Sequence, residues 1–88
     1  MITSVGKAVQ EVQATSVRFE GNRLYVSLSD EREISVPMDK VEWLGWLAHA
    51  MAEERERWSI EPGGFAIYWE DLENGIELSH LMTMQPLV

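Results

Sequence analysis

The chain has 88 residues, no cysteine and a formal net charge of −8, which arises from 7 basic and 15 acidic residues. This length predicts a single domain over residues 1–88. The absence of cysteine excludes disulfides and thiolate metal sites, and it fits a reducing, cytoplasmic compartment. No apolar run is long enough to cross a membrane, and residues 1–13 lack the pattern of a signal peptide.

Three segments of alternating apolar and polar residues predict a meander of strands, at residues 15–19, 23–28 and 32–36. Gly21-Asn22 suits a two-residue hairpin turn because glycine accepts positive φ without steric cost. Residues 29–31 form the second turn, and Pro37 ends the third strand because proline cannot donate to a ladder. The resulting sheet has one apolar face, which another element must cover.

From Asp39 onward the apolar spacing becomes helical, and the sequence predicts one main helix within residues 39–57 that packs on the sheet. Asp39 is the expected N-cap, with Glu42 three residues later as in a capping box. Gly45 is the weak point of this helix, at a cost of about 1 kcal/mol relative to alanine. The pattern allows the helix to continue to Trp58 or to bend near Ala52.

Pro62-Gly63-Gly64 is the strongest break in the chain. Two more strands are expected near residues 58–61 and 65–69, and residues 76–84 should end the fold as a short strand or helix. The predicted class is therefore α+β: an antiparallel meander sheet of three N-terminal strands plus one or two C-terminal strands, packed by one main helix. The residues expected to be buried are Leu24, Val26, Leu28, Ile34, Val36, Leu47 and Ile67.

No residue pattern in the chain is typical of catalysis or of cofactor binding. His49 and His80 are not accompanied by a Gly-x-Ser-x-Gly nucleophile turn. The acidic run at residues 70–75 fails as a calcium loop, because Ile76 stands where that loop requires glycine. We therefore expect no enzyme, no cofactor and no metal site; general acid–base chemistry by the carboxylates of the acidic run is the least favoured alternative.

The segment 41–52 is apolar almost all round a helix, more than one sheet face requires. Trp43, Trp46 and Ala50 share a side in helical spacing, so they are candidates for a protein interface. The alternative is that the C-terminal strands wrap round and cover both tryptophans, which then belong to the core. The sequence leaves both interpretations open.

Order and spacing of several motifs resemble the bacterial family called domain of unknown function 2442, over about residues 12–84. The motifs are Leu24-x-Val26-x-Leu28-Ser29-Asp30-x-Arg32-x-Ile34-Ser35-Val36-Pro37-Met38, then Trp43 with Leu47, His49-Ala50-x-x-Glu53-Glu54-Arg55 with Trp58, and Gly64-x-Ala66-Ile67-Tyr68-Trp69 with Leu72 and Ile76. The chain departs from the family pattern at Gly45-Trp46, Met51-Ala52, Tyr68-Trp69-Glu70 and Glu73-Asn74-Gly75-Ile76. With Ala52 in place of the family's proline, two short family helices can merge here.

The resemblance implies a small α+β domain without established catalysis, and an antitoxin-like role, since some members are encoded beside a second small protein. It carries no catalytic residues over to this chain. The leading hypothesis is a protein-binding module or regulatory partner that contacts another protein or a second copy of itself, but neither nucleic acid nor membrane. The alternative is an acidic inhibitor that mimics nucleic acid, because no Lys or Arg follows Arg57.

Overall fold

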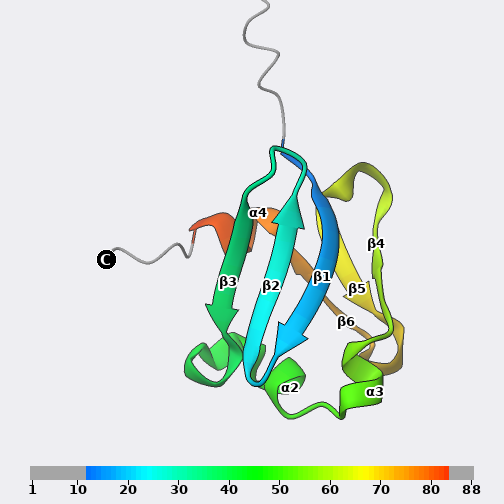
Figure 1. Ribbon diagram of the computed structural model, residues 1–88. Coiled ribbons are helices and arrows are strands. Elements are labelled where there is room, and N and C mark those ends of the chain that lie inside the picture. The colour runs from blue at the N-terminus through cyan, green and yellow to red at the C-terminus, as the bar shows by residue number, and fades with distance from the viewer. Residues whose placement is uncertain (1–11, 84–88) are drawn as a thin grey trace, which may run out of the picture.

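The computed structural model describes residues 12–83, and the predictions for residues 1–11 and for Met84 concern positions outside this range. Six strands and several short helical segments follow one another (Figure 1). The strands are β1 (Ala14–Glu20), β2 (Arg23–Leu28), β3 (Glu33–Pro37), β4 (Trp58–Ile60), β5 (Ala66–Trp69) and β6 (Asn74–Glu77). The α-helices are α2 (Gly45–Ala48), α3 (Ala52–Arg55) and α4 (Leu78–Thr83), and 3-10 turns span Met38–Lys40, Glu42–Leu44, Pro62–Gly64 and Glu70–Leu72.

The three N-terminal strands form the predicted antiparallel meander in the order β1-β2-β3. Glu20 pairs with Arg23, so the first turn has two residues, and its Gly21 has a φ of +58°. A register shift in β1 between Ala14 and Ser16 turns Thr15 outward and leaves Ala14 buried. Strict alternation would place Thr15 on the same face as Val17, and the bulge explains why it is not there.

The turn between β2 and β3 is held by its own side chains. The Asp30 carboxylate accepts hydrogen bonds from the amide of Arg32, at 3.1 Å, and from its Nε, at 2.7 Å. Desolvation acts to raise the pKa of Asp30, but these hydrogen bonds and the charge of Arg32 outweigh it, and the pKa is lowered. Glu31 has a φ of +74°, an unusual conformation for a residue other than glycine, which this side-chain bonding holds in place.

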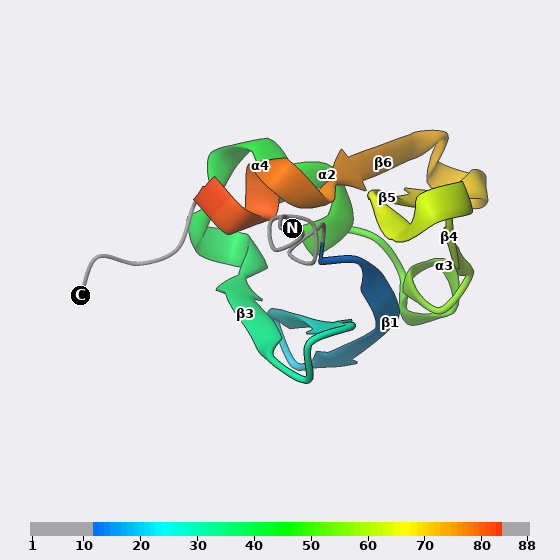
Figure 2. The ribbon, with the colours of Figure 1, turned by 90° about the horizontal axis from the view of Figure 1, so that it is seen from above.

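The strands near residues 58–61 and 65–69 are present, but they do not extend the first meander. They pair with β6 in a second antiparallel sheet of order β4-β5-β6. This sheet lies behind the first one in Figure 1, and the view from above shows the two on different sides of the molecule (Figure 2). The single extended meander sheet was therefore a wrong prediction, although the α+β class holds.

The core lies between the two sheets and is closed by the helical segments. All seven residues predicted to be buried are buried, and the core also contains Ala14, Val17, Met38, Leu44, Trp69, Ile76, Leu78 and Leu81. The apolar face of the first sheet is thus covered by a second sheet and by short helices. Because the second sheet and the short helices together cover this face, no single helix has to span the sheet.

The expected main helix within residues 39–57 was also a wrong prediction. Two 3-10 turns and the separate helices α2 and α3 occupy this segment, with an extended break at Met51. Asp39 lies inside the first 3-10 turn and caps nothing. The chain bends close to Ala52, one of the two courses that the sequence allowed.

A non-local contact stabilises this break. The Arg55 guanidinium donates to the carbonyls of Leu47, at 3.1 Å, and of Ala48, at 2.7 Å, and so satisfies the C-terminal end of α2. A third hydrogen bond, of 3.2 Å, reaches the carbonyl of Gly21 in the β1–β2 turn. The last carbonyls of a helix lack partners within the helix, and a further helical turn would supply them. Arg55 supplies hydrogen bonds to these carbonyls instead, so α2 can end here.

Candidate protein-binding groove

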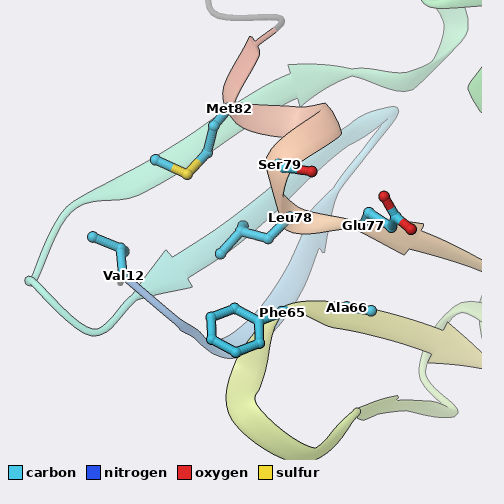
Figure 3. A pocket seen from close by; sticks show the side chains of 7 residues that line it. All are labelled: Val12, Phe65, Ala66, Glu77, Leu78, Ser79 and Met82. Carbon is cyan, nitrogen blue, oxygen red and sulfur yellow. The ribbon is translucent and has the colours of Figure 1, made fainter. Parts of the chain in front are cut away.

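An apolar groove opens where β1 begins, β5 begins and α4 follows β6 (Figure 3). Its volume is 540 Å³, and its lining residues are Val12, Phe65, Ala66, Glu77, Leu78, Ser79 and Met82. Phe65 is 48% exposed, which makes it the most exposed aromatic side chain of the described residues. An amide–carbonyl hydrogen bond of 2.8 Å from Leu78 to Phe65 fixes the start of α4 against the start of β5.

The turn Pro62–Gly64 determines where the Phe65 side chain points. Gly63 and Gly64 have φ values of +90° and +73°, which favour glycine. A Cβ on Gly63 would lie 2.9 Å from the Phe65 ring, and one on Gly64 would lie 2.5 Å from Cβ of Gln13. Both glycines are therefore required for the close packing that places Phe65 at the groove.

One charged side chain of the described residues lines this groove, and it is acidic. Glu77 lines the groove, and no Lys or Arg occurs after Arg57 in the sequence. Arg57 itself forms an ion pair with Asp71 at 2.9 Å. A ligand of the groove would thus meet apolar side chains and one carboxylate, on a chain of net charge −8, which favours a positively charged ligand.

The residues predicted as a protein interface lie outside the groove, and they do not share one face of a single helix. Trp43 belongs to the turn Glu42–Leu44, Trp46 to α2, and Ala50 follows α2. Trp43 is 38% exposed and stacks on His80 of α4, with ring centroids 5.0 Å apart. Trp46 is half-buried and meets Trp69 edge to face, with centroids 5.7 Å apart. None of the three lines the groove, and their role in a protein contact stays a prediction.

These positions give the two tryptophans different expected roles. Trp46→Ala should lower the free energy of unfolding by about 3 kcal/mol, because it opens a cavity beside Trp69. Trp43→Ala should cost about 1 kcal/mol, mainly the stacking on His80. Urea denaturation followed by circular dichroism measures both. Equal losses would show that Trp43 is as much a core residue as Trp46.

The sequence did not single out Phe65. By strand alternation Phe65, Ile67 and Trp69 share one face, so Phe65 would be expected to point inward. The structure places it before β5, with φ −99° and ψ −6° instead of extended angles, and this breaks the alternation. The preceding Pro-Gly-Gly was the available signal, because such a turn changes the direction of the next side chain.

The candidate residues for chemistry are dispersed. His49 bonds through Nδ1 to the carbonyl of Gly45 at 2.8 Å, and His80 stacks on Trp43. Within residues 12–83 no group of three His, Asp or Glu side chains is placed to hold a metal ion. None of the helices described here has the length and apolar character needed to cross a membrane.

The two small antiparallel sheets, closed by short helices around one core, define a small α+β domain with an apolar groove at one end. The model of the family described as protein of unknown function DUF2442 matches residues 14–85, and the chain belongs to this family. This confirms the resemblance seen in the motifs.

The fold is similar to that of a crystal structure of a protein of unknown function from Rhodospirillum rubrum. The two share 22% sequence identity with a TM-score of 0.71, and the match covers 86% of this chain and 90% of the other. At this identity the likeness shows a shared fold. A comparison with functionally curated proteins gives no significant match.

Proposed function

We propose that this chain is a small, acidic, non-catalytic protein-binding module whose groove holds an apolar, basic segment of a partner protein. The observation that carries the proposal is Phe65, 48% exposed beside an apolar groove of 540 Å³. Contact between such a ring and water is unfavourable, so a partner side chain that covers the ring contributes favourably to the free energy of binding. An antitoxin-like or regulatory role in the cytoplasm fits a module of this kind.

The chemistry of the partner follows from the groove and its surroundings. Leu78, Met82 and Val12 offer apolar contacts, and the flexible thioether of Met82 can adapt to side chains of different shape. Glu77 and the net charge of −8 favour Lys or Arg at the flanks of the bound segment. An amphipathic helix with an apolar stripe and basic flanks combines both features.

A synthetic helical peptide of leucine and lysine, titrated by calorimetry, tests the proposal directly. Phe65→Ala should weaken its binding by roughly 30-fold, since truncation of a central aromatic contact costs about 2 kcal/mol. Tyr68→Ala is the matched control, because Tyr68 is also an exposed aromatic residue, 37% exposed, but does not line the groove. Thermal melting should show that both variants remain folded.

The same two variants serve as baits for the natural partner in extracts of the source cell. A protein retained by the wild type and by Tyr68→Ala, but lost from Phe65→Ala, is expected. If Phe65→Ala and Tyr68→Ala bind the peptide and the extract proteins equally well, the groove is not the binding site.

The second candidate function is inhibition by nucleic-acid mimicry, and the uninterrupted acidic character after Arg57 favours it. Salt distinguishes the two candidates. Binding by charge mimicry should fall steeply with ionic strength and be insensitive to Phe65→Ala. Binding in the groove should depend on Phe65 and retain its apolar contribution at high ionic strength.

A further inference from the structure

The outer edge of β3 carries backbone groups that β2 does not use. Among residues 12–83, β3 pairs with β2 alone. Amide–carbonyl bonds of 2.8 Å from Leu28 to Arg32 and from Met38 to Asn22 mark the two ends of this ladder. Bonded positions alternate along an antiparallel pair, so Ile34 and Val36 are the β3 residues that bond to β2.

The residues between them therefore direct their backbone groups outward. Glu33 and Ser35 each present an N–H and a carbonyl to the open edge, and Pro37 presents a carbonyl only. In Figure 1 no described strand lies beside this edge, and α4 passes behind the upper part of β3. An open edge of this kind is a template for pairing with another strand.

We propose that two copies of this chain pair antiparallel through β3, with the two-fold axis at Ser35, to form one continuous six-stranded sheet. In this register Ser35 faces Ser35 of the second copy, and their two N–H groups and two carbonyls bond reciprocally. Glu33 faces Pro37 of the second copy, and the Glu33 N–H donates to the Pro37 carbonyl. Proline lacks an N–H, so this pair forms one hydrogen bond instead of two, and the Glu33 carbonyl receives none from Pro37.

The charges on the outer face are complementary in the same register. Glu33 stands opposite an uncharged Pro37, so no like charges face each other. Arg23 pairs with Pro37 inside one copy, and the row therefore continues from Glu33 across Pro37 to Arg23 of the second copy. Within one copy Arg18 of β1 already reaches across β2 to Glu33, with Nη2–Oε1 at 3.4 Å. An arginine of this sheet can thus reach across one intervening strand. In the same way Arg23 of one copy can reach across its own β3 to Glu33 of the other copy.

The inner face also has room for the added strand. A hollow of 360 Å³ lies beside β3 and is lined by Leu28, Arg32, Glu33, Ile34 and Met82. Ile34 and Val36 of the second copy would lie on the same inner side of the joined sheet, where the core of their own copy already covers them. This hollow shares Met82 with the groove, whereas Phe65 lines the groove alone.

Sedimentation equilibrium over a wide concentration range tests the pairing. The wild type should form a dimer, and Ser35→Pro should weaken its dissociation constant by roughly 30-fold, because it removes two of the four interchain hydrogen bonds. The Ser35 amide points away from β2, so this proline leaves the internal ladder intact. Ser35→Ala is the control: it loses the 2.8 Å hydrogen bond from Arg23 to Oγ but keeps the amide, and it should dimerise like the wild type.

A cysteine variant tests the register without a change to the backbone. The chain has no cysteine, so Ser35→Cys introduces a single thiol. Residues opposite each other in a bonded antiparallel pair have Cα atoms about 5.5 Å apart, a spacing that a disulfide can bridge. Under diamide oxidation Ser35→Cys should cross-link rapidly, whereas Ser16→Cys, exposed on β1, should not. A wild type that stays monomeric at millimolar concentration, or a Ser35→Cys that cross-links no faster than Ser16→Cys, would overturn the proposal.

Discussion

Replacing Trp69 with alanine is expected to lower the free energy of unfolding by about 3–5 kcal/mol, the range for truncation of a fully buried large aromatic side chain. Trp69 is completely buried in β5 and meets Trp46 of α2 and Phe19 of β1 edge to face, at 5.7 and 6.4 Å. Its ring therefore joins both sheets and the helical segment. For a domain of this size the melting temperature should fall by at least about 12 °C, as measured by calorimetry.

Two further variants separate the contributions of this residue. Tyr68→Ala, at the adjacent position with its side chain outward, should change stability by less than about 1 kcal/mol. Trp69→Phe keeps an aromatic ring but removes the indole N–H, which donates to the carbonyl of Arg55 at 3.0 Å. It should cost an intermediate amount, about 1–3 kcal/mol. A Trp69→Ala protein as stable as Tyr68→Ala would show that the two sheets do not depend on this ring.

Arg55→Ala is expected to be the most destabilising change of a charged residue, at about 2–3 kcal/mol. It removes three charge-assisted hydrogen bonds to backbone carbonyls, two at the end of α2 and one in the β1–β2 turn. Arg55→Lys should recover little, because an ammonium group cannot reproduce the fork that meets Leu47 and Ala48 together. Urea denaturation measures the loss.

Arg57→Ala is the matched control, two residues further along the chain. Its ion pair with Asp71 is largely exposed to solvent and should contribute less than about 1 kcal/mol. If Arg55→Ala and Arg57→Ala lose the same stability, the contacts of Arg55 with the carbonyls are not what holds α2 and the turn together.

Local patterns were sufficient to predict the strands and most of their inward residues. Alternation with period two requires only neighbouring residues, and β1, β2 and β3 lie within one residue of their predicted bounds. The turn at Gly21 followed from the backbone freedom of glycine, a property of the residue itself. Family membership was also evident from the order and spacing of short motifs.

Helical spacing in residues 39–57 was misleading, because an apolar residue every three or four positions also suits a chain that wraps round one end of the core. Leu44 and Leu47 are buried in either arrangement. Arg55 stabilises the end of α2 through its hydrogen bond to the Ala48 carbonyl, and the spacing of apolar residues does not indicate this contact. The same applies to the tryptophans: Trp46 is drawn toward the core by Trp69, from a strand beyond the break, while Trp43 is left to stack on His80.

The sequence by itself thus determined the α+β class, the three N-terminal strands, the main buried residues and the family. Only the tertiary structure decided that the strands form two sheets instead of one, since alternation specifies which side chains point inward and not which edges pair. It also decided that Phe65 faces a groove, because the positive φ values of Gly63 and Gly64 override the alternation of β5. The candidate site arises from contacts between residues far apart in the chain. The open edge of β3 arises because β4 and β5 pair in a second sheet, and local spacing indicates neither outcome.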